Sequence, residues 1–486
     1  MSTAVDMKNI RFWPVMTAIF FGSFLTILSI SMINIALPAL IDDFHSSLST
    51  IQWTLTGFML SLGTIAPLTG YLGDKFGYKR VYLFAIIGFT VFSLLCGFAW
   101  SATSLIVFRI IQGMFSGLVL PATMTIIFQV IPRAKQPMAI SLWALSAMLA
   151  PAFGPTISGW LIQYYSWKWL FFINVPIGLL AIVLIIFMIP HYRLSVAKSL
   201  DVLGLVTVIL SSASLLVALS QGHSWGWTSL RVLGLFAFGL LMLAIFIVRE
   251  LRADEPLLNL KVFKNIRFTL SLITTTIVTI SLYSGTFLTP LFLQTVQHVT
   301  PLDTGIILLP ASLAMAVAMP LIGKLYTKLG PRALSVPGIL LIVIGTLAVS
   351  WLSTSTSHLY IIFWMTIRNI GVALTMMPSS NAGMEEIPAV LSGHASAITN
   401  WVRNVFGSFA IALFSTLLAS HIPTHAATLA AEGAGNEQTI TLLAYTMSVN
   451  DVYLLATFIA LIALPFTWMV KKHKPKEALV PAEVVA

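Results

Sequence analysis

The chain has 486 residues, of which 58% are hydrophobic and 9% are charged, and its mean hydropathy is +0.95. A soluble globular protein carries about a quarter charged residues, so this composition excludes that class. The formal net charge of +10 would suit a nucleic-acid-binding protein, but the basic residues are spread between long apolar runs.

Fourteen apolar runs follow one another along the chain, and most reach the ~20 residues that a helix needs to cross a bilayer. Their apolar residues are continuous and do not alternate, which predicts helices and not strands. The predicted fold class is an all-α polytopic membrane protein with 14 transmembrane helices. The expected spans are 12–37, 51–72, 81–100, 103–129, 138–160, 168–190, 202–220, 231–248, 268–294, 303–323, 335–352, 357–381, 395–420 and 452–470.

The basic residues predict how these spans are oriented. Of the 26 Lys and Arg residues, 21 fall in the two termini and in alternate loops, whereas the opposite loops hold Lys168 and Arg231. By the positive-inside rule we expect both termini to be cytosolic, in a multi-pass protein of the cell (cytoplasmic) membrane. The loop after the twelfth span departs from the rule because it lacks basic residues. The net charge then reports topology, and no nucleic-acid partner is expected.

Two loops repeat one pattern. Gly70 and Gly77 follow the second span, and Gly323 and Gly330 follow the tenth, with basic residues between and after each pair. Two related six-helix bundles with a binding site between them are typical of secondary transporters. The expected division is an N-terminal bundle over 1–200, an inserted helix pair over 201–250, a cytosolic linker over 251–267, and a C-terminal bundle over 268–486 with a long outer loop at 421–451.

At this point the motifs resemble those of the major facilitator superfamily. Within it, the 14-helix drug:H+ antiporter-2 family, the EmrB/QacA type of multidrug efflux transporter, is the most similar. The matching residues are Gly70, Asp74, Gly77 and Arg80 in the signature loop; Arg109, Gln112 and Gly113 in the fourth span; Gly154, Pro155 and Gly159 in the antiporter motif of the fifth; Asn34 and Pro38 at the end of the first; and Ser166 to Gly178 entering the sixth.

The resemblance covers nearly the whole chain and implies the major facilitator fold. It also implies proton-coupled export of drugs or other amphiphilic compounds by alternating access, with a role in antibiotic resistance. No Walker-type phosphate loop is present, so ATP-driven transport is not expected. We expect no enzyme activity and no cofactor. The expected partners are a small amphiphilic substrate, protons and the bilayer, and an accessory export protein is left open.

The signature loop is expected to act as a latch. Its glycines permit a tight turn, and Asp74 can accept hydrogen bonds at the N-terminus of a neighbouring helix. Such a contact would close the cytosolic face and break during transport. The alternative is that the charges of this loop only fix topology.

The antiporter motif is expected to bend and thin its helix. Pro155 removes a backbone donor, and the adjacent glycine allows close helix packing. The family resemblance assigns this motif to preventing leak and favouring antiport. Ser158 stands where a glycine is common, which is a mild departure.

Three arginines lie within apolar spans: Arg109, Arg368 and Arg403. An arginine at the bilayer midplane costs at least about 2.5–3.5 kcal/mol, so each is expected to face a cavity or a partner. We expect at least one to line the central cavity. The alternative for Arg109 is structural, with the side chain capping backbone carbonyls of a broken neighbouring helix.

The first span departs from the family pattern at Ser29, where the 14-helix branch commonly has an acidic residue. No Asp or Glu lies deep in any expected span, and carboxylates such as Glu385 and Glu386 stand at span edges. A proton carrier must then be an edge carboxylate, a histidine such as His394, or the substrate itself. We therefore expect neutral, zwitterionic or anionic substrates; the alternative is an apolar pocket served by edge carboxylates.

Two other functions stay open. One is an exporter or flippase of lipid- or fatty-acid-like anionic amphiphiles, which the arginines and the missing acid favour. The other is a transporter-like sensor, against which the intact signature residues argue; import also stays open because the fold does not set direction. His421 and His425, four residues apart in the expected outer loop, allow a metal site, but solvated polar residues are the stronger expectation.

Overall fold

The structure is a computed structural model that describes residues 12–132, 135–190, 201–253, 256–388, 391–434 and 436–470. Within these ranges the regular structure is helical and includes no strand, as the sequence predicted. The helices are α1 Phe12–Phe44, α2 Leu48–Ile51, α3 Trp53–Ile65, α4 Leu68–Phe76, α5 Tyr78–Gly97, α6 Ala102–Val130, α7 Gln136–Tyr164, α8 Trp169–Phe172, α9 Asn174–Met188, α10 Val202–Trp225, α11 Leu230–Arg252, η3 Leu260–Lys264, α12 Ile266–Thr295, α13 Pro301–Leu329, α14 Pro331–Ala348, α15 His358–Met384, α16 Ser392–Ala431 and α17 Glu437–Met469.

Twelve helices in the described ranges are long and apolar enough to cross a membrane. A thirteenth span is formed if α2–α3 and α4, which bend by 55° at a short break, count as one. Pro67 lies at this break, and its missing N–H interrupts the helical ladder. The expected span 138–160 falls within α7, which is not among the thirteen, so the count of fourteen stays a prediction.

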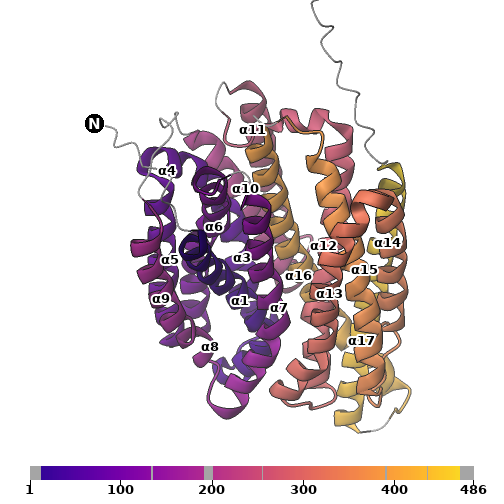
Figure 1. The fold of residues 1–486 in the computed structure, drawn as a ribbon. Coiled ribbons are helices and arrows are strands. Elements are labelled where there is room, and N and C mark those ends of the chain that lie inside the picture. Colours follow the sequence, from indigo (N-terminus) through magenta and orange to yellow (C-terminus); the bar gives the residue numbers. More distant parts are fainter. Residues whose placement is uncertain are drawn as a thin grey trace, which may run out of the picture.

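The helices form two groups with a further pair beside them (Figure 1). In the first group, α1 to α9, helix α1 packs against α7 and α9, and α6 packs against α3 and α5. In the second group, α12 to α17, helix α15 packs against α12, α13 and α14, and α17 packs against α12, α14 and α16. Helices α10 and α11 pack on each other, and α10 also contacts α16. The division at residues 200, 250 and 267 stays a prediction.

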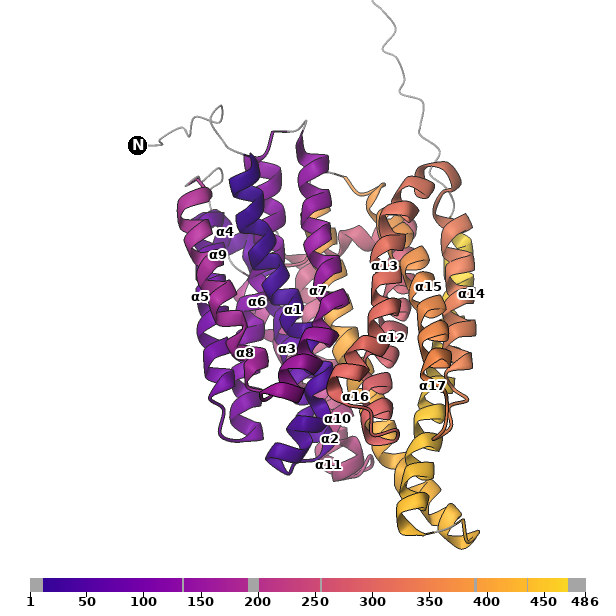
Figure 2. The same cartoon turned by 60° about the horizontal axis from the view of Figure 1, so that its bottom comes forward.

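Helix α1 begins and α17 ends at the same end of the molecule (Figure 2). We call this the inner end, following the orientation predicted from the basic residues, and the opposite end the outer end. Two glycine turns lie at the inner end. Gly77 joins α4 to α5 with φ +87°, and Gly330 joins α13 to α14 with φ +80°. Residues other than glycine are strained at such angles, so the repeated sequence pattern builds the same turn twice.

The prediction of a long outer loop at 421–451 is wrong. Helix α16 continues to Ala431 and α17 begins at Glu437, so most of this segment is helical. Its alanines have the highest helix propensity of any residue, although the segment is too polar to read as a membrane span. Gly433, with φ +70°, follows the end of α16 as a left-handed cap.

The linker expected at 251–267 packs against the second group. Leu258 and Val262 are buried and belong to one hydrophobic cluster with Ile387 and Ile398. The backbone N–H of Asn259 donates to Nδ1 of His394 at 3.3 Å. The described part of the linker is therefore held on the inner ends of α15 and α16.

Candidate functional site

A guanidinium group is buried at the centre of the first group. Arg109 on α6 has no exposed surface. Its Nε donates to the carbonyl oxygen of Thr54 at 2.9 Å, and its Nη1 donates to Ser29 Oγ at 2.9 Å and to Gln112 Oε1 at 2.8 Å. The Phe58 ring centre lies 4.0 Å from the guanidinium carbon. One arginine therefore joins α1, α3 and α6.

Ser29, which the sequence analysis selected because it is not acidic, is thus a direct partner of Arg109. Ser29 offers a hydroxyl where a carboxylate would neutralise the charge. In the described ranges the buried carboxylates are Asp201 and Glu250, which belong to the inner ends of α10 and α11. Nη2 of Arg109 has no hydrogen-bond partner among the described residues. A buried charge with incomplete pairing is costly and raises the local positive potential.

The second group has an arginine in the corresponding helix. Arg368 lies on α15, which follows the Gly330 turn as α6 follows the Gly77 turn, and it is also fully buried. It donates to the carbonyl of Ser281, to Ser284 Oγ at 3.3 Å, to Thr346 Oγ1 at 3.2 Å and to Asn369 Oδ1 at 3.2 Å. Its partners are again hydroxyls, a carbonyl and an amide.

Arg403 differs because it is only partly buried. It lies on α16 and donates from Nη2 to Asn400 Oδ1 at 3.1 Å. One turn later, a Cβ added to Gly407 would lie 2.6 Å from the ring of Tyr283 on α12 and 2.7 Å from Met59 on α3. Helix α16 of the second group therefore lies at the interface with the first group. Of the three arginines, Arg403 is the one whose side chain keeps some exposed surface.

The antiporter motif joins the two groups at the outer end. A Cβ on Gly159 of α7 would overlap the carbonyl oxygen of Pro301 at the start of α13, and one on Gly305 would lie 2.6 Å from the Pro155 carbonyl oxygen. Thr156 Oγ1 donates to the Gly305 carbonyl at 3.2 Å. Glycine on both sides is what allows the two backbones to approach this closely.

The same helix also packs tightly on α1. A Cβ on Gly154 would overlap Ser31, and Ser158 Oγ donates to the Met32 carbonyl at 2.7 Å. The serine that departs from the family pattern thus makes a bond that glycine cannot. Nearby, Asn34 is buried with no partner for its Oδ1 among the described residues, and Pro38 interrupts the ladder of α1.

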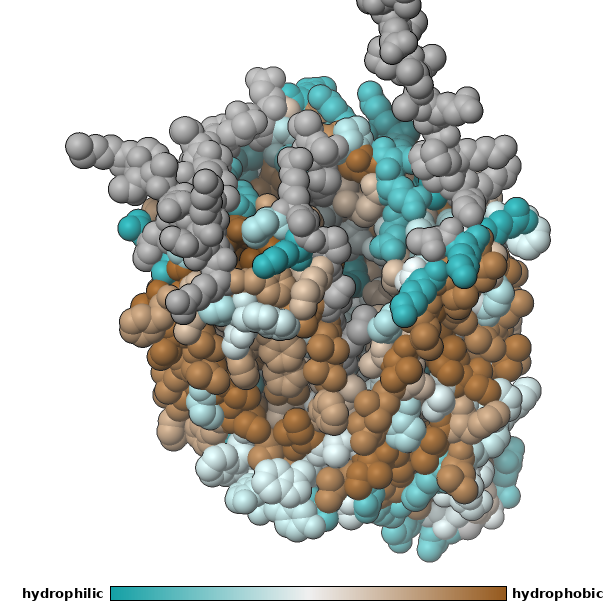
Figure 3. Space-filling view, viewed as in Figure 1, coloured by the Kyte–Doolittle hydropathy of each residue, from teal (hydrophilic) through white to brown (hydrophobic). Residues whose placement is uncertain are grey.

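The signature loop lies at the inner end. Asp74 accepts a hydrogen bond from the Tyr78 hydroxyl at 3.4 Å, which joins α4 to the start of α5. Lys79 Nζ donates to the Ile186 carbonyl at 2.7 Å, near the end of α9. Among the described residues, no atom outside its own stretch of α4 lies within 4 Å of a Cβ built on Gly70, and Arg80 is exposed. The latch role stays a prediction. Figure 3 shows that the molecular surface is hollowed at this end, between the two groups.

Glu385 and Glu386 also lie at the inner end, in an ion-pair network with a residue that the sequence analysis did not select. Arg267 donates to Glu385 at 2.7 Å and to Glu386 at 3.0 Å. The Tyr326 hydroxyl donates to Glu385 at 2.5 Å. The network ties the start of α12 to the ends of α13 and α15. Sequence reasoning missed Arg267 because it precedes Glu385 by 118 residues and was counted as a topology charge.

Replacing Arg267 by glutamine is expected to destabilise the protein. The arginine is 7% exposed, whereas the two glutamate side chains are about a third exposed, so water compensates for part of the loss. We expect a loss of about 1–3 kcal/mol, measured as a lower melting temperature in detergent. Arg231→Gln, at an exposed position on α11, is the matched control. Equal melting temperatures for the two variants would contradict the role of the network.

Two helical groups that are in close contact at one end, with a hollow between them at the other, are typical of membrane transporters built from two halves. Residues 19–412 match the family model of the Major Facilitator Superfamily, and the chain belongs to that family. It is 36% identical over 404 residues to the uncharacterized MFS-type transporter YhcA of Bacillus subtilis (strain 168), covering 83% of this chain and 76% of that protein.

Two further relatives are named for resistance. The chain is 32% identical to the tetracenomycin C resistance and export protein of Streptomyces glaucescens, over 85% of this chain and 77% of that protein. It is 29% identical to the lincomycin resistance protein LmrB of Listeria innocua, over 97% of this chain and 99% of that protein. Among solved structures, a bacterial homologue of the lysosomal transporter Spinster, inward-facing and unoccupied, shares the fold with a TM-score of 0.67 at 15% identity, covering 95% of this chain and 98% of that one.

Proposed function

We propose that this transporter exports antibiotics or other amphiphilic compounds across the cytoplasmic membrane in exchange for protons, by alternating access, with both termini in the cytosol. It belongs in this proposal to the 14-helix drug:H+ antiporter-2 family and performs no enzymatic reaction. The observation that carries the proposal is the close contact of α7 with α13 at the outer end, opposite the hollowed inner end. The resistance names of two relatives support it.

The arginines support a preference for neutral or anionic substrates. Arg109 and Arg368 are buried among neutral partners, and Arg403, on the helix that contacts both groups, is partly exposed. Charges act over longer distances in a protein and lipid interior than in water, so a cationic substrate is disfavoured there. The same observation favours the second candidate function, the export or flipping of lipid- or fatty-acid-like anionic amphiphiles.

Substrate-triggered proton movement in inside-out vesicles tests the proposal. Adding a transported compound to energised vesicles should release protons, and Asp74→Asn or Glu386→Gln should abolish the release if that carboxylate carries the proton. A panel of cationic, neutral and anionic amphiphiles gives the charge preference. Transport with no proton response in the wild type would remove the antiporter assignment.

Arg403 gives the corresponding test of substrate charge. Arg403→Gln should raise the KM for an anionic amphiphile about tenfold, because a charge-assisted contact contributes about 1.5–3 kcal/mol, and should leave a neutral one nearly unchanged. Arg403→Lys keeps the charge and should retain most of the affinity. Equal effects on neutral and anionic compounds would argue against a charge contact.

A further inference from the structure

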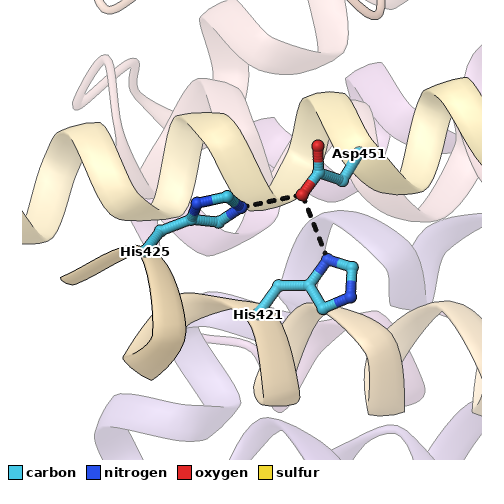
Figure 4. Close-up of side chains that lie close together, drawn as sticks. All are labelled: His421, His425 and Asp451. Atoms are coloured by element: carbon cyan, nitrogen blue, oxygen red, sulfur yellow. Dashed lines mark hydrogen bonds and ion pairs between the residues drawn. The ribbon is translucent and has the colours of Figure 1, made fainter. Parts of the chain in front are cut away.

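Two histidines and an aspartate meet at the outer end of the second group (Figure 4). His421 and His425 lie four residues apart on α16 and therefore share one face of that helix. Asp451 projects toward them from α17. Its Oδ2 lies 2.7 Å from His425 Nε2 and 3.2 Å from His421 Nδ1. Neither the transport mechanism nor the glycine contacts use these side chains.

One carboxylate oxygen of Asp451 faces nitrogens of two imidazole rings, whereas a simple ion pair would need only one partner. His421 Nδ1 is buried and makes no hydrogen bond among the described residues, although it lies 3.2 Å from the carboxylate. One ligand atom from each of the three residues lies within 4.8 Å of the others. All three residues are partly exposed, so water can complete a coordination shell.

We propose that His421, His425 and Asp451 form a binding site for one divalent transition-metal ion, of which Zn²⁺ is the best fit. Two imidazole nitrogens and one carboxylate are a ligand set that Zn²⁺ accepts at about 2.0–2.2 Å, with water in a fourth position. Imidazole ligands favour Zn²⁺ and its neighbours over Mg²⁺ and Ca²⁺, which prefer oxygen. The ion takes the place of the hydrogen bond between His425 Nε2 and Asp451 Oδ2.

Such an ion links α16, which ends at Ala431, to α17, which begins at Glu437. The two helices pack on each other, and His425 and Asp451 are 26 residues apart in the sequence. Helix α16 also carries Arg403 and packs against α3 of the first group. Metal binding therefore restrains a helix that contacts both groups. The site therefore stabilises the outer end of the second group when the ion is bound.

Titration of the purified full-length protein with Co²⁺, followed by competition with Zn²⁺, tests the site. The protein is prepared in detergent without a polyhistidine tag and stripped of metal with EDTA. We expect one Co²⁺ per chain with the visible absorption of a low-coordinate site, displacement by Zn²⁺, and a higher melting temperature with Zn²⁺. An excess of Mg²⁺ should displace neither ion.

Asp451→Asn keeps the shape of the side chain and removes its charge, and His425→Gln removes one imidazole. Each should weaken Zn²⁺ binding at least about tenfold, since even changes beyond the direct ligands cost that much. His358→Gln, at an exposed histidine on α15, is the matched control and should bind as the wild type does. Melting temperatures in EDTA show whether each variant is folded.

Two results would overturn the site. One is the absence of stoichiometric binding to the folded wild type. The other is binding that Asp451→Asn and His425→Gln, both folded, leave unchanged, because the ion would then be held elsewhere. Neither result bears on export, which the vesicle assay measures separately.

Discussion

Gly159→Leu is expected to reduce export strongly and to open the outer end of the transporter. Even a Cβ at this position overlaps the Pro301 carbonyl oxygen, which is backbone and cannot turn aside. Helix α7 must then move away from α13, and overpacking of this kind costs about 1–3 kcal/mol. Since 1.4 kcal/mol is a factor of ten, the ratio of molecules closed to molecules open at the outer end should fall about tenfold.

Cysteine labelling measures this opening. The chain has a single cysteine, Cys96, which is buried, so one introduced cysteine gives a clean signal. Asn400→Cys places a thiol beside Arg403, between the groups. An impermeant maleimide added from outside should label it about tenfold faster in the Gly159→Leu background.

Gly234→Leu is the matched control for this experiment. Gly234 is an exposed glycine of α11, and among the described residues no atom of another helix lies within 4 Å of a built Cβ, so the same substitution meets no neighbouring backbone there. Its export and labelling rate should equal those of the wild type. If Gly159→Leu also behaves like the wild type, the contact between α7 and α13 does not hold the outer end closed.

Local patterns in the sequence predicted local structure well. Apolar runs located the helices, and the repeated glycines marked both left-handed turns, at Gly77 and Gly330. Hydropathy cannot say which helices meet, however. The sequence analysis selected Gly159 through its motif. The contact of Gly159 with Pro301 was not predicted, because these two residues are 142 positions apart and meet only through the packing of α7 on α13.

The candidate site shows the same limit. Ser29 and Arg109 were each selected, one for a missing acid and the other for a buried charge, yet their hydrogen bond across 80 residues was not predicted. A signal for it existed, since the first span offers a serine and no acid in the same chain that has an arginine within an apolar span. The histidines were set aside because 421–451 was expected to be a loop, where a spacing of four does not place two side chains on one face.

The bond between Ser29 and Arg109 leads to the second large expected effect. Ser29→Asp should shift substrate preference toward cations by about tenfold or more. The new carboxylate would lie beside Arg109 Nη1, which is now 2.9 Å from the serine hydroxyl. Opposite unit charges 4 Å apart attract by about 4 kcal/mol at an effective dielectric of about 20, so the positive potential of this centre is largely cancelled. A third of that energy already corresponds to about a tenfold change in affinity.

Ser29→Asn separates charge from size in this prediction. Asparagine has the shape of aspartate but no charge, so it should leave the order of substrate preference unchanged while its added volume lowers the transport rate in both variants. The measurement is the ratio of KM values for one cationic and one anionic amphiphile in inside-out vesicles, with melting temperatures to show that each variant is folded. Equal ratios for Ser29→Asp and Ser29→Asn would mean that Arg109 holds α1, α3 and α6 together without setting the charge of the substrate.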